Sequence, residues 1–107
     1  MRVLGAILLA AFLFAVPATA ASQDSPNYNA KVIRQVFGSR GSEAVSVAYC
    51  ESRLHVWARN GQYLGLFQMG SFARARFGHG WDAWSQSRAA HRYFLYAGGW
   101  GPWSCRP

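Results

Sequence analysis

The chain is poor in acidic residues. Only four Asp and Glu stand against eleven Lys and Arg in 107 residues, which gives a formal net charge of +7 at pH 7. A cationic protein of this kind suits an anionic target such as a cell wall, a membrane surface or extracellular nucleic acid. Charge alone does not choose among these targets, nor does it exclude a simple role in solubility. The shortage does mean that any acid–base chemistry depends on very few carboxylates.

Long hydrophobic runs are also scarce. The single run, from Val3 to Val16, has about 14 residues, fewer than the ~18 expected of a membrane-spanning helix. Arg2 precedes it and the small residues Ala18-Thr19-Ala20 follow it, as in a secretory signal peptide. We therefore predict a signal peptide over residues 1–20 and a secreted, periplasmic or cell-wall location. An uncleaved membrane anchor is the alternative; after cleavage we expect no stable membrane insertion.

Cysteine is limited to Cys50 and Cys105. In an exported protein an even pair with no competitor predicts a disulfide. Three scattered histidines, His55, His79 and His91, do not combine with the cysteines in a metal-ligand spacing. We therefore expect no metal and no other cofactor.

The remaining length allows one small domain. Residues 21–29 are polar, contain Pro26 and are predicted to form a linker, so the domain covers residues 30–107. Apolar residues at helical spacing predict a first helix from about Ala30 to Gly38. Ser42 is a plausible N-cap for a second helix, which carries Glu51 at its C-terminal end.

The second half of the chain alternates turn signals with short periodic segments. Asn60-Gly61 predicts a tight turn in a small hairpin or irregular β segment. A short helix is expected over residues 71–77, and a last helix over residues 86–96, capped by Asp82 or Ser85 and closed by Gly98-Gly99. The fold class expected is α+β, mostly helical, with a short β segment beside the Glu51 helix.

Glu51 stands out chemically because it lies between a cysteine and a serine, about a dozen residues before an apolar segment containing Gln68. Cleaving a glycosidic bond needs a carboxylic acid that is still protonated near neutral pH. Ordinary glycosidases also need a second carboxylate about 5–9.5 Å away. Glu43 lies about 12 Å along the helix and is rotated by about 80°, Asp24 falls in the linker, and Asp82 fits an N-cap. These residues favour a mechanism with a single carboxylate.

Four motifs together resemble the lysozyme-like transglycosylase domain, in its small secreted form. They are Cys50-Glu51-Ser52, Asn60-Gly61, Gly65-Leu66-Phe67-Gln68-Met69 and Gly99-Trp100-Gly101-Pro102-Trp103. The resemblance extends from about Ala44 to Cys105 and implies a lysozyme-like fold. It also implies that Glu51 is the sole general acid and base, and that Ser52 helps to hold the site.

The same resemblance implies the substrate-binding residues. Gly65 and Leu66 correspond to backbone and packing elements of the sugar groove, and Gln68 to a polar substrate contact. In the last helix the family carries Asn, a small residue and then Tyr, where this chain has Gln86, Ala90 and Tyr93. Gln86 replaces the usual Asn, and Tyr96, one turn later, is the alternative to Tyr93.

Aromatic side chains are further candidates for stacking on sugar rings. Tyr63 is preferred because it directly precedes the groove segment. The other candidates are Trp57, Trp81, Trp84, Trp100 and Trp103. In so small a domain, most of them are expected in the core.

The function expected is cleavage of the β-1,4 linkage between MurNAc and GlcNAc in peptidoglycan, with a 1,6-anhydro product. Water as the nucleophile would instead make the chain a hydrolytic lysozyme. A non-catalytic cationic protein that binds cell wall or nucleic acid is the alternative from another class, and membrane lysis is a third. Because the arginines are dispersed and no nucleic-acid motif is present, we expect peptidoglycan strands rather than nucleic acid as the partner, and a monomer.

Overall fold

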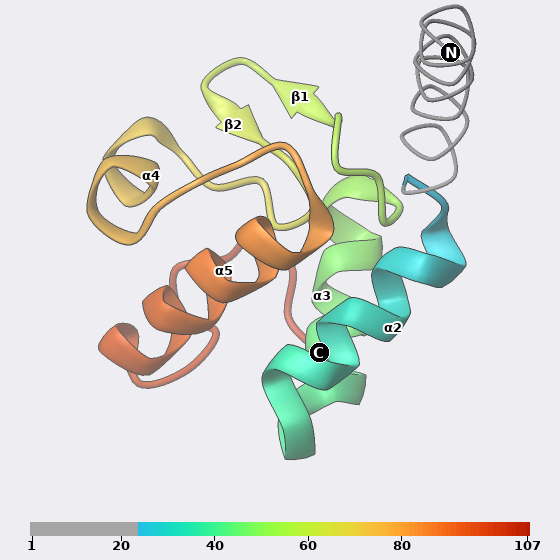
Figure 1. Cartoon of the computed structure of the whole chain (residues 1–107). Coiled ribbons are helices and arrows are strands. Elements are labelled where there is room, and N and C mark those ends of the chain that lie inside the picture. Colours follow the sequence, from blue (N-terminus) through green and yellow to red (C-terminus); the bar gives the residue numbers. More distant parts are fainter. Residues whose placement is uncertain (1–23) are drawn as a thin grey trace, which may run out of the picture.

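The computed structural model describes residues 24–107, which form a mostly helical domain with a small antiparallel sheet (Figure 1). The predicted signal peptide and residues 21–23 lie outside the described residues. The α+β, mostly helical class predicted from the sequence is confirmed at this level. The elements are α2 (Pro26–Phe37), the short 3-10 helix η1 (Gly38–Arg40), α3 (Gly41–Ser52), β1 (Arg59–Asn60), β2 (Tyr63–Leu64), α4 (Ser71–Phe77) and α5 (Ala83–Ala97).

Helix α2 begins earlier than predicted, so the assignment of residues 26–29 to a linker is wrong. Pro26 occupies its first turn and the Ser25 side chain accepts a hydrogen bond from the Tyr28 amide at 3.1 Å. Asn29 is fully buried, and its Nδ2 donates to the Leu54 carbonyl at 2.8 Å. The segment therefore belongs to the folded domain. The end of α2 at Gly38 agrees with the prediction.

Helix α3 begins at Gly41 rather than after an N-cap at Ser42, and Arg40 occupies the cap position. The two helices come close together at this point: a Cβ atom at position 41 would lie 3.0 Å from the Arg34 Cα, so a larger residue would require α2 to shift slightly. Residues of α3 that face the core are small or medium-sized: Ala44, Val47 and Ala48.

The remaining elements agree with the prediction in type and order, although α5 begins three residues before the predicted start at Gln86. The hairpin pairs Arg59 with Leu64 and Asn60 with Tyr63, with Gly61 in the turn at a φ of 61°. Helix α4 covers the predicted residues 71–77 and α5 covers residues 83–97. Asp82 is its N-cap, as one of the two predicted choices, because its side chain accepts a hydrogen bond from the Ser85 amide at 2.9 Å.

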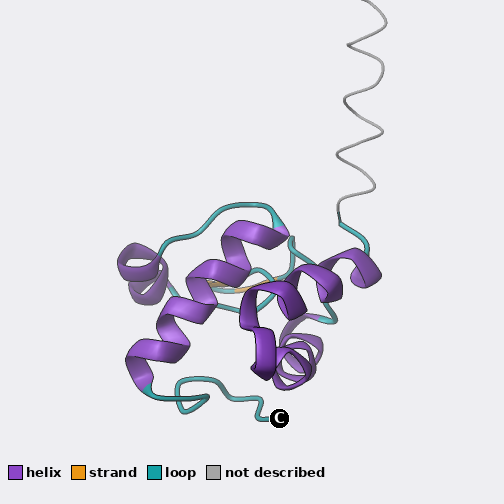
Figure 2. Ribbon diagram, turned by 60° about the horizontal axis from the view of Figure 1, so that its bottom comes forward, coloured by secondary structure: helices purple, strands orange, loops and turns teal. Residues whose placement is uncertain are grey.

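The core lies between α2, α3 and α5 and is completed by aromatic rings from the C-terminal tail. The ring of Phe37 in α2 lies 5.6 Å from that of Phe67 and 5.5 Å from that of Trp100, centroid to centroid. After α5 the tail turns back toward α2 and α3 (Figure 2). The predicted Cys50–Cys105 disulfide is confirmed and fixes the tail to α3, with 6.0 Å between the two Cα atoms.

No helix within residues 24–107 combines the length and the hydropathy needed to cross a membrane.

Candidate active site

A cleft of about 260 Å³ opens beside the C-terminal end of α3. Its walls come from α3, the hairpin, the segment after β2, α4, α5 and the C-terminal tail. The lining residues are Glu51, Asn60, Tyr63, Gln68, Met69, Gly70, Ala73, Tyr93, Pro102, Trp103 and Ser104. Segments that are distant in the sequence thus converge on a single carboxylate, that of Glu51.

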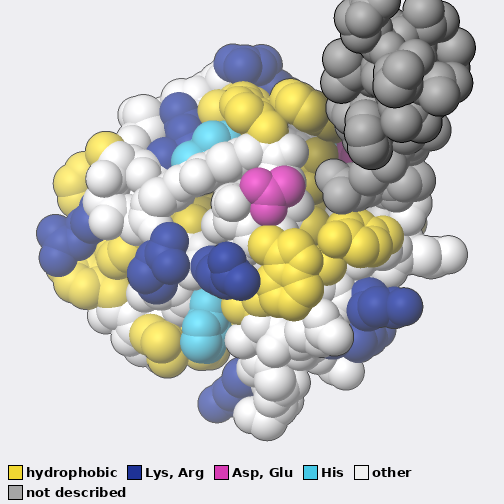
Figure 3. All heavy atoms as spheres, viewed as in Figure 1, with side chains coloured by type: hydrophobic (Ala, Val, Ile, Leu, Met, Phe, Trp, Pro, Cys, Tyr) yellow, Lys and Arg dark blue, Asp and Glu magenta, His cyan; other side chains and the backbone are white. Residues whose placement is uncertain are grey.

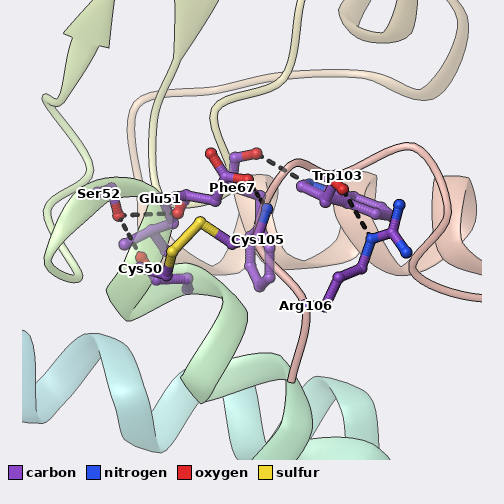
Figure 4. The surroundings of a disulfide bond; sticks show 9 residues. Cys50, Glu51, Ser52, Phe67, Trp103, Cys105 and Arg106 are labelled. Carbon is purple, nitrogen blue, oxygen red and sulfur yellow. Dashed lines mark hydrogen bonds between the residues drawn. A yellow bond between two sulfur atoms is a disulfide. The ribbon is translucent and has the colours of Figure 1, made fainter.

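Glu51 lies in the last turn of α3 and is half-buried. Its Oε2 accepts a hydrogen bond from the Cys105 backbone amide at 3.1 Å (Figure 4). The neighbouring Cys50 is bonded to the same Cys105 through the disulfide. Cys105 therefore fixes the Glu51 carboxylate beside the cleft in two ways, through its disulfide bond to the neighbouring Cys50 and through its backbone N–H.

Helix α3 ends at Ser52, one residue after Glu51, because the next two residues adopt left-handed backbone angles. The φ values are 55° for Arg53 and 66° for Leu54. Such angles are uncommon for residues other than glycine, and they cluster at functional sites. The buried Ser52 hydroxyl supports this bend: it accepts from the Leu54 amide at 3.1 Å and lies 2.8 Å from the Leu66 carbonyl. Ser52 thus joins α3 to the segment that forms the cleft floor.

The segment after β2 is positioned from behind by the buried side chain of Gln86 in α5. Its Oε1 accepts a hydrogen bond from the Leu66 amide at 2.8 Å, and its Nε2 donates to the carbonyls of Val56 and Gly80 at 3.1 and 2.8 Å. The backbone of Gly65 passes so close that a Cβ atom there would lie 2.5 Å from the Gln86 Oε1. Sequence reasoning noted Gln86 only as a departure from the family pattern and missed its structural role.

The predicted site residues divide into two groups. Glu51, Tyr63, Gln68 and Tyr93 line the cleft. Ser52, Gly65 and Leu66 are buried and lie outside the cleft lining, so they position the site without presenting a side chain to it. The predicted place of Ser52, Gly65 and Leu66 among the substrate-binding residues is therefore not reflected in the lining of this cleft, and their contribution to sugar binding stays a prediction.

Part of the Gln68 side chain is used in hydrogen bonds that hold the cleft wall together. The residue has a φ of 46°, and its Nε2 donates to the carbonyls of Ala58 and Gly65 at 3.2 and 3.0 Å. With the amide nitrogen occupied in this way, its Oε1 is the atom suited to accept a hydrogen bond from a bound hydroxyl or amide.

Tyr93 occupies the α5 side of the cleft. Its ring stacks on Phe77 at 4.9 Å and lies 5.0 Å from the Trp103 ring. The alternative residue, Tyr96, is 65% exposed and is absent from the cleft lining. Of the two tyrosines, only Tyr93 is therefore placed to contact a molecule bound near Glu51.

All four acidic residues of the chain lie in the described part, and three of them serve structural contacts. Asp24 accepts from the Val56 amide at 3.0 Å, and Asp82 caps α5. Glu43 accepts from the indole N–H of Trp100 and from Arg40, each at 3.0 Å. The Trp100 hydrogen bond, with a smaller contribution from Arg40, lowers the pKa of Glu43. Glu51 is the only acidic residue in the cleft lining.

The tryptophans proposed for sugar stacking have different locations. Trp103 lines the cleft, although it is largely buried and its Nε1 donates to the Phe67 carbonyl at 2.9 Å. Trp100 belongs to the core, and Trp84 lines a separate hollow beside α2. Trp57 and Trp81 stack on each other at 4.8 Å and are 60% and 41% exposed, but neither lines the cleft.

The contribution of the tail to the cleft could have been anticipated in part. The predicted disulfide already required residues near Cys105 to lie beside Glu51, and Trp103 and Ser104 precede that cysteine. No feature of the sequence marks the other lining residues, Asn60, Met69, Gly70 and Ala73. Their place in the lining depends on how the hairpin and α4 pack.

Among residues 24–107, no three His, Cys, Asp or Glu side chains come close enough together to hold a metal ion. Basic side chains are spread over the face shown in Figure 3 rather than concentrated in one place.

Comparisons with protein-family models, curated proteins and solved structures found no match to this chain.

Proposed function

We propose that this protein cleaves the β-1,4 bond between MurNAc and GlcNAc in peptidoglycan, using Glu51 first as general acid and then as general base. The observation that carries the proposal is the single carboxylate in the cleft, given that the other three acids of the chain are engaged elsewhere. A lysozyme-like fold, suggested by the motifs around Glu51 and Gln68, is part of the same proposal.

The chemistry balances without a second carboxylate or a cofactor. Protonated Glu51 gives its proton to the glycosidic oxygen as the bond from that oxygen to C1 of MurNAc breaks, which releases the GlcNAc end. The C6 hydroxyl oxygen of the same MurNAc then bonds to C1, and its proton passes to the Glu51 carboxylate. The acid is restored, no water is consumed, and the product is a 1,6-anhydro sugar.

Other groups in the cleft suit the binding of a sugar. Tyr63 is 46% exposed at the hairpin, where its ring can pack against a pyranose face. The Oε1 of Gln68 can accept a hydrogen bond from an N-acetyl or hydroxyl group. Tyr93 of α5 also lines the cleft and carries a hydroxyl that can hydrogen-bond a sugar. Because the Cys105 amide already holds one Glu51 oxygen, the other is the atom suited to proton transfer.

Attack by water on the same intermediate would give a reducing end and would make the enzyme a hydrolase. The transglycosylase reaction is preferred because hydrolysis by an ordinary inverting or retaining route uses a second carboxylate, at about 5–9.5 Å from the first. Asp82 is the only other candidate, and both of its oxygens bond to Ser85, at 2.9 and 2.8 Å.

The experiment is digestion of purified sacculi by the wild-type protein and by the Glu51→Gln variant, with mass analysis of the released muropeptides. We expect anhydro products from the wild type and no release above background from the variant. Reducing-end products alone, heavier by one water, would replace the transglycosylase assignment by a hydrolase.

The non-catalytic alternative makes a different prediction in the same experiment. A protein that only binds the wall would release nothing in either form and would sediment equally with sacculi as wild type or variant. Retained sedimentation of Glu51→Gln, together with lost release, supports the enzyme and shows that the variant is folded.

A further inference from the structure

The outer surface of α4 and α5 combines exposed apolar side chains with arginines. Phe72, Leu95 and Tyr96 are 72%, 63% and 65% exposed, which is unusual for side chains of this size. Arg76 lies one turn after Phe72, and Arg92 lies one turn before Tyr96. We call these five residues the α4–α5 surface. Figure 3 shows hydrophobic and basic side chains side by side in the region of α4.

Direct contacts hold the two helices of this surface together. The Arg76 guanidinium lies 4.5 Å from the centroid of the Tyr96 ring, which joins α4 to α5. Arg92 donates from Nε to the Phe77 carbonyl at 2.9 Å, across the same junction. Arg76, Arg92 and Tyr96 therefore meet at the junction of the two helices, with Phe72 one turn from Arg76 and Leu95 next to Tyr96.

The charge of this part of the chain has one sign. Helices α4 and α5 contain no Asp or Glu, and the nearest acid in the sequence, Asp82, is used to cap α5. Arg74 and Arg88 add two further cations to the same helices. A ligand that fits this surface must carry negative charge and must also accept apolar side chains.

We propose that the α4–α5 surface docks the protein on an anionic phospholipid membrane. Headgroup phosphates would pair with Arg76 and Arg92, while Phe72, Leu95 and Tyr96 enter the boundary between headgroups and acyl chains. The mode is peripheral binding, not spanning. It is independent of Glu51, because the cleft uses Ala73 and Tyr93 of the same two helices, not the five residues of this surface.

A lipid surface fits these residues better than nucleic acid does. Single-stranded nucleic acid is bound by stacking bases on free aromatic faces. The Tyr96 ring already carries the Arg76 guanidinium against it and lies 5.5 Å from the Phe77 ring. Leu95 has no aromatic ring on which a base could stack. Its side chain makes no hydrogen bonds, so it can enter the acyl region of a membrane without losing any.

The test is co-sedimentation with vesicles of equal parts phosphatidylglycerol and phosphatidylcholine, compared with pure phosphatidylcholine. We expect binding to the anionic vesicles only, decreasing as salt rises because charge attraction is screened. Phe72→Ser and Tyr96→Ser should each weaken partitioning about tenfold through lost apolar burial. Arg76→Gln should weaken it about fivefold through the loss of one cation.

A matched pair elsewhere on the molecule provides the control. On α3 the exposed Tyr49 carries Arg53 over its ring at 4.7 Å, the same kind of pair as Tyr96 and Arg76. Tyr49→Ser and Arg53→Gln should leave vesicle binding unchanged. The wild type and all variants are prepared from the predicted cleavage site onward, without residues 1–20, so that the apolar run at residues 3–16 does not bind the vesicles, and thermal melting verifies their folding.

Three outcomes would overturn the proposal. One is equal binding of the wild type to neutral and anionic vesicles. Another is an equal loss in the α3 and α4–α5 variants, which would mean that only overall charge and apolarity matter. The third is unchanged vesicle binding together with lost binding of a single-stranded oligonucleotide, which would assign the surface to nucleic acid. Glu51→Gln should bind vesicles as the wild type does, so failure of the proposed enzymatic function would be seen separately.

Discussion

The two ends of helix α3 carry the same residue type in different surroundings. Glu43 lies in the first turn and Glu51 in the last, and each accepts a hydrogen bond from the C-terminal tail, Glu43 from the Trp100 indole and Glu51 from the Cys105 amide. Glu43 also pairs with Arg40 at 3.0 Å, at a helix end where the dipole favours a negative charge.

Glu51 shares the tail contact but differs from Glu43 in its position on the helix and in its charged neighbours. It lies at the end of the helix where the dipole disfavours a negative charge, and no cation of residues 24–107 is within ion-pair distance of it. It also borders the cleft. Two carboxylates on one helix, both bonded to the tail, therefore have different surroundings. Glu43 is paired with Arg40 and holds the tail through Trp100, while Glu51 borders the cleft without an ion-pair partner among residues 24–107.

The largest expected effect comes from replacing each glutamate in turn by glutamine. Glu51→Gln should lower the initial rate of muropeptide release by about 10³-fold, within the range that general acid–base catalysis contributes. Glu43→Gln should keep that rate within about twofold, because its contacts are structural. Rates are measured on the same sacculi preparation. Equal losses in both variants would remove the functional distinction between the two ends of α3.

The disulfide should give the next largest effect, on stability. It closes a loop of 55 residues between α3 and the tail, so the double variant Cys50→Ser/Cys105→Ser should lower the free energy of unfolding by about 4 kcal/mol. Its activity should also fall, because the Cys105 amide would no longer be fixed beside Glu51. Urea denaturation of the variant and of the reduced wild type should agree; a loss below about 1 kcal/mol would contradict the chain-entropy estimate.

Much of the fold was predictable because its signals are local. Helices end at Gly38, Gly78 and Gly98, each with a positive φ, and Asp82 caps α5. The disulfide followed from having only two cysteines. From this pairing and the position of Glu51 on its helix, the sequence also predicted that the tail returns to the Glu51 helix.

The rest depends on contacts between residues that are distant along the chain. Asn29 reaches the Leu54 carbonyl across 25 positions, a contact that joins the start of α2 to the rest of the domain and that no local pattern reveals. The Gln86 amide reaches Leu66 across 20 positions, and no local pattern marks it. Likewise, nothing in the sequence indicates that Trp57 and Trp81 pair at the surface instead of lining the cleft. Long-range hydrogen bonds and ring contacts of this kind become visible only in the folded molecule.

The role of Gln86 can be tested through Gly65, with Gly61 as a matched control. Both glycines have positive φ, 82° and 61°, but only at Gly65 would a Cβ meet another side chain, at 2.5 Å from the Gln86 Oε1. Gly61→Ala should cost about 1 kcal/mol from backbone strain alone, and Gly65→Ala about 2–3 kcal/mol because Gln86 must also move. Urea denaturation measures both. Equal costs would mean that Gln86 does not constrain the segment.

The smallest expected effect concerns the pH dependence of the anchor at Glu43. The Trp100 indole and Arg40 lower the pKa of the Glu43 carboxyl below 4.5 in the folded state, so folding favours its ionised form. The resulting stabilisation is present above the unfolded-state pKa and is lost as the pH falls through the lower folded-state pKa. The melting temperature of the wild type should therefore exceed that of Glu43→Gln slightly at neutral pH, with the difference shrinking once the pH drops below 4.5. Thermal melts of both proteins at matched pH measure this difference. A difference that grew on acidification would mean that the tail is bound by the protonated carboxyl, and the contrast with Glu51 would then need another physical basis.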